Sequence, residues 1–563
     1  MHAYRDDESV GGHWFFNPRT KGFEWESYRS LATKAIDLAD SIKASGLREG
    51  AVVLIVAGSP RFTINAFYTV IAAKAVPLIL PALGTFGGVE TWRQHLLVVV
   101  ASLGGSPVLV EDVLEARLAL GDEHAFNPLY CPPDLEGLPI ELERRCSKYY
   151  CFALGDTAFL QMTSGTTGRG KLLAISTANV FANTFGIRKA ALLNENEIGV
   201  SWLPLYHDMG LVGAELFCFV HDYQLVMLTP QDFVRRPQRW IEVIGDFKCT
   251  MAVSANFGLD YCVKSIPDSA VQRYNVSTLK AVFCGSEPIR RRSLFGFVDK
   301  FKAAGFNLNM VLPCYGMAET TLACTIRNPR DPVKFLAVNR DTVASGALVD
   351  IAALSLDAHN KSVGQNQLEL VSVGPTIEGV SIKILDEEGN AMEEGRCGEI
   401  VVSGSSVANG YFNTATKLLM AFEDGWVYTG DLGFMHQGEL YIVDRLKGII
   451  VCNGINYSCA DLEEQAAAIV GAPVDRFAVF EENINPESGK SAVVLLIDGG
   501  PGIKEERVKE VLSQLATIYP RLSHVLLGQR RFIPRTTSGK KRYDECRQLL
   551  SSGQIETALN EPL

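Results

Sequence analysis

The sequence lacks the features that mark several classes of protein. Its 13 cysteines include no CxxC pair and no Cys/His cluster at zinc spacing, so they are expected to be small buried residues in a reducing compartment. No long Lys/Arg run offsets the net charge of −11, so no general attraction for nucleic acid is expected. The most apolar stretch, Ile64 to Leu83, is interrupted by Lys74, Pro77 and Pro81, which makes it a poor membrane span.

The chain is long and apolar enough to bury several cores. Its 563 residues suggest about three or four folding units, and 47% of them are hydrophobic while 21% are charged. The first residues, MHAYRDDESVGG, lack the basic and then apolar pattern of a secretory signal. A cytoplasmic protein is therefore expected.

The first half of the sequence alternates between helix and strand patterns. Tyr28 to Ser45 and Phe62 to Ala75 carry apolar residues at helical spacing, while Ala51 to Gly58 and Val76 to Leu80 are short apolar runs between turn residues. Such alternation is typical of parallel α/β layers.

Strand patterns become more frequent farther along, and a small unit follows them. Glu369 to Leu385 and Gly398 to Gly404 read as β runs, so a β-rich subdomain is expected. GELYIVDRLKGIIVCNG, from Gly438, reads as two strands around a turn, and helices are expected over Cys459 to Val470 and Ile503 to Tyr519. The predicted fold class is α/β: a large N-terminal domain (1–443) of α/β layers with a β-rich subdomain, and a small, mobile α+β C-terminal domain (444–563).

The strongest local signal is FLQMTSGTTGRGKLLAIS, from Phe159 to Ser176, where an apolar strand enters a loop rich in Gly, Ser and Thr. Small residues let backbone N–H groups approach a polyphosphate closely, and Lys171 adds positive charge. A Walker A loop fails because Leu172 replaces the hydroxyl that would hold Mg²⁺ and LLAIS predicts a strand instead of a helix. Taken alone, the segment is more typical of a flexible hairpin.

Four further segments accompany this loop, and together the five resemble the adenylate-forming superfamily, which includes acyl-CoA synthetases, peptide-synthetase adenylation domains and luciferases. In order, they are Thr163 to Lys171, Cys314 to Glu319, Tyr428 to Leu432, Arg445 to Lys447 and Pro534 to Lys540. Five matches in the family's order, spread over about 380 residues, are very hard to obtain by chance.

The resemblance implies that ATP and Mg²⁺ are used to join a carboxylate to the α-phosphate with release of pyrophosphate. The implied nucleotide-binding residues are Thr163, Ser164, Gly165, Thr166, Thr167, Gly168, Lys171, Gly285, Ser286, Glu287, Cys314, Tyr315, Gly316, Met317, Asp431 and Arg445. By resemblance, the loop cradles the β- and γ-phosphates, Tyr315 stacks on adenine, and Asp431 accepts hydrogen bonds from the ribose. Glu319 and Thr167 are the implied Mg²⁺ ligands.

Two lysines in or beside the small domain have implied roles as well. Lys540 bridges the carboxylate and the α-phosphate, a task suited to a compact charge on a flexible stem. Lys447 is the implied hinge, since Lys540 and the phosphate loop lie in different domains and must approach and separate during two half-reactions.

Three features resemble the fatty acyl-AMP ligase branch. Leu203 to Leu211 is similar to its LPxYHDMGL segment, and this resemblance assigns catalytic His207 to the acyl-phosphate region; alone, the histidine is more often a partly buried structural one. Asn256 and Phe257, and the run from Gly285 to Arg290, are similar to its PNFAY and GAEPVR segments. Asn256 and Phe257, with Trp202, are the predicted acyl pocket, although such apolar residues are more often plain core. An insertion at about 330–368 resembles the one understood to hinder CoA-dependent closure, although its length alone is more typical of an ordinary surface insertion.

The implied reaction is activation of a fatty or related carboxylic acid, followed by transfer to the phosphopantetheine thiol of a separate holo acyl carrier protein. A separate carrier is expected because only 20 residues follow Tyr543. Two alternatives remain: an acyl-CoA or aryl-CoA synthetase, and an adenylate-binding module without catalysis. The motifs leave the acyl chain length and the oligomeric state open.

Overall fold

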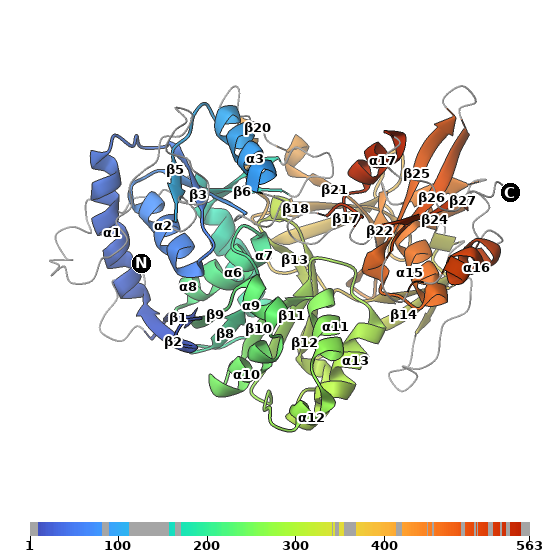
Figure 1. Cartoon of the computed structure of the whole chain (residues 1–563), viewed down its shortest axis with the longest axis horizontal. Helices are drawn as coiled ribbons and strands as arrows, with labels where there is room; N and C mark the ends of the chain where they lie inside the picture. Colours follow the sequence, from blue (N-terminus) through green and yellow to red (C-terminus); the bar gives the residue numbers. More distant parts are fainter. Residues whose placement is uncertain are drawn as a thin grey trace.

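The fold is known from a computed structural model of the chain. The residues described are 10–81, 89–111, 157–163, 171–339, 342–343, 348–353, 367–412, 419–420, 422–446, 449–452, 455–485, 490–499, 503, 505–515, 522–529, 532–535 and 541–552. The N-terminal half forms one side of the molecule, and the segments from β23 onward lie at the opposite end (Figure 1).

One large sheet is seven-stranded, with the order β20-β19-β7-β6-β4-β3-β5. Its strands are β3 (Val52–Val56), β4 (Val76–Leu80), β5 (Val108–Val110), β6 (Thr157–Met162), β7 (Leu172–Ser176), β19 (Tyr411–Phe412) and β20 (Leu419–Met420). The helices that follow its strands or precede them are α1 (Tyr28–Ala44), α2 (Pro60–Ala72), α3 (Val89–Ser102) and α6 (Thr177–Ala190). The predicted strands and helices are thus present, although α2 ends at Ala72, before Lys74 adopts a positive φ of 60°.

The other large sheet is eight-stranded, with the order β13-β12-β11-β10-β8-β9-β1-β2. Its strands are β1 (Gly12–Asn17), β2 (Gly22–Ser27), β8 (Ile198–Ser201), β9 (Gln224–Met227), β10 (Met251–Ala255), β11 (Ala281–Gly285), β12 (Val311–Gly316) and β13 (Ala323–Ile326). β10, β11 and β12 are parallel neighbours, so their carboxyl ends meet at one edge of the sheet.

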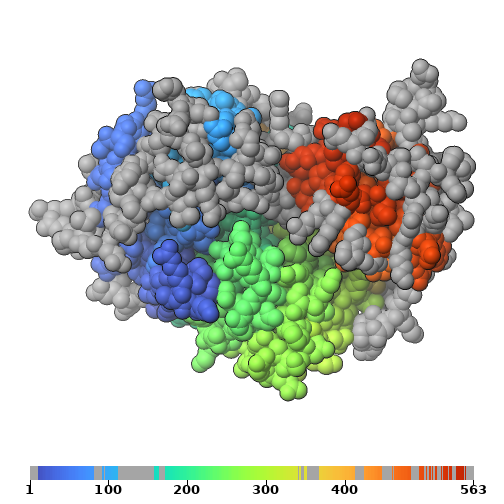
Figure 2. Space-filling view, viewed as in Figure 1, coloured from blue at the N-terminus to red at the C-terminus, as the bar shows by residue number. Residues whose placement is uncertain are grey.

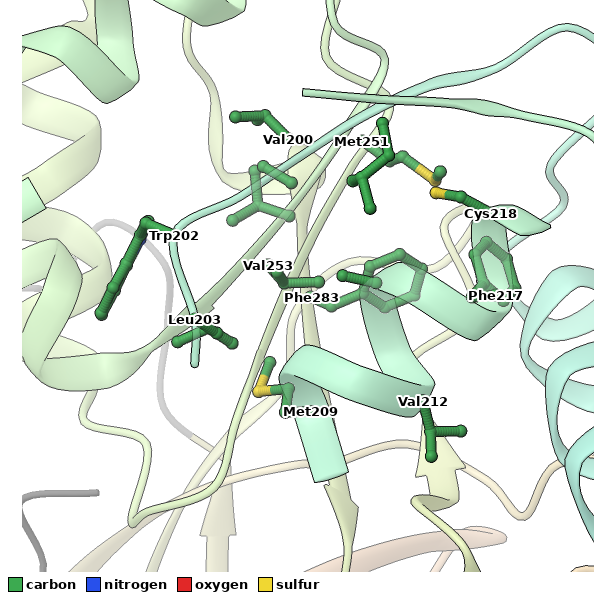
Figure 3. Packing of buried hydrophobic residues seen from close by; sticks show 14 of the residues in the cluster. Val200, Trp202, Leu203, Met209, Val212, Phe217, Cys218, Met251, Val253 and Phe283 are labelled. Atoms are coloured by element: carbon green, nitrogen blue, oxygen red, sulfur yellow. The ribbon is translucent and has the colours of Figure 1, made fainter. Parts of the chain in front are cut away.

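Helices and short turns complete the layers around this sheet. They are α7 (Asp208–Gly210), the π-helix η3 (Leu211–Leu216), α8 (Phe217–His221), α9 (Pro230–Arg235), α10 (Gln238–Asp246), α11 (Asn256–Ser265), α12 (Asp268–Val271), α13 (Arg291–Phe301), η4 (Lys302–Ala304), η5 (Leu308–Met310) and η6 (Ala318–Thr320). Figure 3 shows Trp202, Leu203 and Met209 in the same buried cluster as Val253 and Phe283.

The β-rich subdomain consists of two small antiparallel sheets. One is β17 (Val380–Leu385), β18 (Gly398–Gly404), β21 (Val427–His436) and β22 (Glu439–Arg445), and the turn η8 (Glu423–Gly425) precedes β21. The other is β15 (Ile351–Ala353), β14 (Phe335–Asn339) and β16 (Gln367–Val371), which covers the described part of the predicted insertion. Leu336 and Val338 of β14 pack with Phe434 and Tyr441, so this sheet adds to the subdomain's core.

The C-terminal segments form an α+β unit with its own buried clusters. It contains β23 (Ile449–Cys452), β24 (Ile455–Ser458), α15 (Cys459–Val470), η10 (Val474–Arg476), β25 (Phe477–Asn485), β26 (Lys490–Asp498), α16 (Glu505–Leu515), β27 (Leu522–Gly528) and α17 (Tyr543–Ser551). The helix predicted over Ile503 to Tyr519 is shorter in its described part, which ends at Leu515.

One detail of the sequence interpretation changes. The two strands expected around the turn after Gly438 do not pair with each other, because β22 pairs with β21 while β23 pairs with β24. The predicted fold class is confirmed. The boundary at residue 444 stays a prediction. Across the described residues, no helix combines the length and the apolar character needed to cross a membrane.

Candidate active site

Asp431 lies at the centre of a polar cluster between β21 and β22. The register of these strands places Asp431 opposite Arg445, and Arg445 Nε lies 3.0 Å from Asp431 Oδ1. Tyr315 Oη donates to Asp431 Oδ2 at 2.8 Å. Asp431 is 6% exposed, whereas the Arg445 side chain is 57% exposed. The carboxylate is therefore oriented by two partners, and a ligand can approach along the exposed arginine.

The predicted adenine-binding residues gather at the carboxyl ends of β11 and β12. Gly285 is the last residue of β11, and a Cβ there would lie 2.9 Å from both Cys314 O and Cys314 Sγ, so only glycine fits. Ser286 has a positive φ of 68° and its Oγ lies 3.3 Å from Met209 Sδ. Burial raises the pKa of the Cys314 thiol to about 12, so this thiol stays neutral.

Tyr315 and Gly316 are positioned by the β12–β13 pair. Burial, with the nearby Asp431 charge, raises the pKa of Tyr315 well above its usual value, so its hydroxyl is a neutral donor. A Cβ on Gly316 would lie 1.7 Å from Leu322 O, which requires glycine at this close approach of two backbones. Met317 N donates to Thr320 Oγ1 at 3.4 Å and begins the turn that carries Glu319.

Tyr411, which the sequence interpretation missed, connects Glu319 with Lys171. Tyr411 Oη donates to Glu319 Oε1 at 3.0 Å, and Lys171 Nζ lies 4.4 Å from the centroid of the Tyr411 ring. The backbone of Glu319 is fixed as well, because its carbonyl accepts from Ala408 N at 2.9 Å. The Tyr411 side chain therefore contacts both the acidic Glu319 and the basic Lys171.

The ends of the predicted phosphate loop are paired. Thr163 N donates to Lys171 O at 2.9 Å, and Lys171 N donates to Thr163 Oγ1 at 3.3 Å. The two residues thus close the β6–β7 hairpin, with LLAIS forming the predicted strand. Ser164, Gly165, Thr166, Thr167 and Gly168 lie outside the described residues.

His207 and Asp208 form a pair at the start of α7. His207 Nδ1 lies 2.7 Å from Asp208 Oδ1, and the two side chains are 20% and 14% exposed. Met209 N also lies within 3.3 Å of His207 Nδ1, which makes His207 the N-cap of α7. The ring is thus held by its Nδ1 side.

The three predicted acyl-pocket residues lie together. The Trp202 and Phe257 rings meet edge to face with centroids 5.7 Å apart, and Trp202 stacks on Phe233 at 4.0 Å. Phe257 is 43% exposed, whereas Trp202 is 3% exposed. Asn256 is buried and its Oδ1 accepts from Arg290 N at 3.1 Å. Trp202, Asn256 and Phe257 together form the predicted acyl wall. Phe257 N donates to Glu287 Oε1 at 2.5 Å, which joins the acyl wall to the residues that follow β11.

Lys540 and Lys447 lie outside the described residues, so their predicted roles stay predictions. The residue after Lys540 is described: Lys541 Nζ pairs with Glu463 Oε2 and donates to Val474 O at 3.2 Å. No cluster of three metal-ligating His, Cys, Asp or Glu side chains occurs in the part of the chain that the structure describes.

Comparisons with known proteins show the family to which the chain belongs. Residues 6–412 match the family model described as AMP-binding enzyme. A putative acyl-CoA synthetase of Caulobacter vibrioides is 27% identical over 531 residues, covering 91% of this chain and 88% of that protein. The medium-chain-fatty-acid–[acyl-carrier-protein] ligase TtuA of Teredinibacter turnerae is 30% identical over 431 residues, covering 71% of this chain and 64% of that protein.

A solved structure supports the same grouping. It comes from a study of fatty acyl-adenylate ligases from E. coli and L. pneumophila, is 25% identical, covers 97% of this chain and 96% of that chain, and superimposes with a TM-score of 0.80. The family match covers well over half of the sequence and includes the phosphate loop, the Glu319 turn and Tyr411. The chain belongs to the AMP-binding enzyme family, and the predicted membership of the adenylate-forming superfamily is confirmed.

Proposed function

We propose that the protein is a fatty acyl-AMP ligase that loads a separate acyl carrier protein. In the first half-reaction a fatty carboxylate attacks the α-phosphate of ATP, forming acyl-AMP and releasing pyrophosphate. In the second, the phosphopantetheine thiol of the carrier attacks the acyl carbonyl, gives up its proton and releases AMP. The observation that carries the proposal is the Asp431 cluster, where Tyr315 and Arg445 orient one nearly buried carboxylate for a ribose.

The phosphate end is assigned to Glu319, Lys171 and the loop between Thr163 and Lys171. Mg²⁺ binds triphosphates through few carboxylates and keeps water and phosphate oxygens as its other ligands, so a single Glu319 with Thr167 fits it. Bound Mg²⁺ neutralises phosphate charge. Tyr411 fixes the Glu319 carboxylate by a hydrogen bond and lies against Lys171, and so keeps both charges oriented before ATP binds.

The acyl end is assigned to His207, Trp202, Asn256 and Phe257. Trp202 and Phe257 supply apolar surface for an alkyl chain, and the exposed Phe257 ring leaves one side of this wall accessible. His207, fixed at Nδ1, faces the acyl phosphate in this proposal. Lys540 supplies the positive charge that joins the two anions in the transition state. TtuA, whose name states a carrier-protein acceptor, supports the choice of acceptor.

ATP–pyrophosphate exchange with medium- and long-chain fatty acids tests the proposal, with CoA and a holo carrier protein offered in parallel. We expect acid-dependent exchange and acyl-carrier thioester, with little acyl-CoA. Efficient acyl-CoA formation would instead establish the synthetase alternative, which the Caulobacter relative's name favours. Lys540→Ala is expected to lower exchange by at least about 100-fold, while Lys302→Ala, an exposed lysine of the large domain, leaves it unchanged.

Nucleotide binding without exchange for any acid would indicate the adenylate-binding module. Wild-type exchange in Lys540→Ala would contradict the role assigned to this lysine.

A further inference from the structure

Two adjacent glutamates of α15 face different partners. Glu463 is 3% exposed and points into the C-terminal unit, where its carboxylate accepts from Val479 N and from Tyr543 Oη, both at 2.9 Å, and pairs with Lys541. Glu464 pairs with Arg290 of the large domain. Figure 1 shows α15 on the side of the C-terminal unit that faces α13, and Figure 2 shows the orange C-terminal atoms beside the body of the molecule.

The Glu463 side of this helix is connected to Lys540. Lys541 directly follows Lys540, and its side chain is only 12% exposed, with the ammonium between Glu463 and Val474 O. Tyr543 opens α17 and is fixed by the same carboxylate. α15 therefore fixes the residues that immediately follow Lys540. If α15 takes another position on the large domain, Lys541 and Tyr543 take it as well.

The Arg290 side is connected to the predicted acyl wall. Arg290 is the residue before α13, and its backbone N donates to Asn256 Oδ1 at 3.1 Å. Asn256 Nδ2 donates in turn to Ser293 Oγ at 3.1 Å, so the two helix starts are joined at two points. The next residue, Phe257, donates its N–H to Glu287. Arg290 is thus the outermost member of a connected set of contacts that includes Asn256 and Glu287.

Charges of both signs surround the start of α13, where Glu464 contacts Arg290. Arg290 precedes α13, Arg291 and Arg292 begin it, and Arg291 Nη1 pairs with Glu369 Oε2 at 3.2 Å. Burial raises the pKa of Asp260 and that of Glu369, and the negative charge of Glu464 adds to the rise in both. Glu464 therefore acts on the α13 cluster as a whole, and its most direct partner is the Arg290 guanidinium.

We propose that Arg290 and Glu464 are a positioning pair that sets the place of the C-terminal unit on the large domain, and with it the place of Lys540 relative to the acyl wall. The proposal rests on the proposed function, because it links the pair to the two half-reactions. The pair stabilises the orientation seen here, so its loss changes the ratio of the adenylation rate to the thioester-transfer rate.

The experiment compares Arg290→Glu, Glu464→Lys and the double variant that exchanges the two charges. Single-turnover acyl-AMP formation and transfer to holo carrier are measured for each, together with hydrogen exchange of the peptides that contain α13 and α15. Arg236→Glu is the matched control, because Arg236 pairs with Glu242 at 2.7 Å wholly within the large domain.

Each single variant is expected to change the rate ratio by at least threefold and to increase exchange in both peptides, and the double variant is expected to recover most of both changes. The control leaves them unchanged. Ratios and exchange within experimental error of wild type, or a double variant no better than the singles, would overturn the proposal. A wild type that activates no fatty acid contradicts the proposed function instead, and the hydrogen-exchange comparison then decides on the pair alone.

Discussion

Asp431 shows at the scale of one residue how neighbouring groups orient a small charged side chain. Its two carboxylate oxygens have different partners, Arg445 Nε at 3.0 Å and Tyr315 Oη at 2.8 Å. Charge-assisted hydrogen bonds are roughly twice as strong as neutral ones, so the orientation is well fixed.

Asp431→Asn is expected to raise the KM for ATP by about tenfold or more, since lost hydrogen bonds to a charged group cost about 1.5–3 kcal/mol. Tyr315→Phe keeps the ring and removes one donor, so we expect a change of only about threefold. Both KM values come from pyrophosphate exchange at varied ATP. An unchanged KM in Asp431→Asn would contradict the ribose assignment.

Glu197 gives a second prediction at this scale, about stability. Burial alone would raise its pKa, but hydrogen bonds from Lys280, Thr250 and Asn194 together lower it below 4.5. A carboxyl whose pKa is lowered by folding stabilises the protein above its unfolded pKa, and this contribution is lost as the pH falls through the folded pKa.

Glu197→Gln is therefore expected to lower the free energy of unfolding by about 1–3 kcal/mol at pH 7. The difference from wild type should shrink as the pH falls below 4.5. Denaturant unfolding at pH 7 and at pH 4 measures it. Glu195→Gln is the control, since Glu195 is exposed two residues away. A difference independent of pH would mean that packing, and not charge, explains the loss.

At the scale of elements, β19 is the least conspicuous part of the site in the sequence. It has two residues, Tyr411 and Phe412, and lies between the edge strand β20 and β7 of the seven-stranded sheet, where Tyr411 pairs with Leu173. Motifs are read along the chain, whereas Tyr411 reaches Glu319 and Lys171 only because this strand returns to β7. No local pattern around Tyr411 could have predicted that contact.

Tyr411→Phe keeps the ring below Lys171 but removes the donor to Glu319, whereas Tyr411→Leu removes both contacts. In Tyr411→Phe we expect the Mg²⁺ concentration for half-maximal exchange to rise by about threefold. In Tyr411→Leu we expect a larger rise in this concentration, together with a lower maximal rate of exchange. Mg²⁺ titrations at saturating ATP separate these effects. Equal behaviour of the two variants would show that the aromatic contact to Lys171 does not matter.

Other parts of the site were predictable because their signals are local. Gly285 and Gly316 belong to short segments that resemble motifs of the adenylate-forming superfamily, and LLAIS has the apolar pattern of a buried strand. The pairing of β22 with β21 was not predictable in this way, since the sequence between Gly438 and Gly454 looks like one hairpin. Strand pairing depends on residues distant in sequence, so local patterns predict elements better than partners.

At the scale of the whole molecule, the buried clusters of the C-terminal unit are separate from the main core. Leu495 in β26 and Phe477 in β25 belong to one such cluster, while Ile55 in β3 belongs to the core of the large domain. Domains with their own cores can unfold in separate steps. We therefore expect two calorimetric transitions, of which ATP raises the one that belongs to the large domain.

Leu495→Ala is expected to lower the free energy of unfolding of the C-terminal unit by about 2–5 kcal/mol, because it leaves a cavity at a fully buried position. The transition of that unit then occurs at a lower temperature. Ile55→Ala is the matched change in the large domain and should lower the other transition by a similar amount. The assignment is checked by adding ATP, which should raise the transition that Ile55→Ala lowers and not the one that Leu495→Ala lowers. If both substitutions shift one common transition, the two cores unfold as a single unit, and the contacts between them, the Arg290–Glu464 pair included, are stronger than separate unfolding allows.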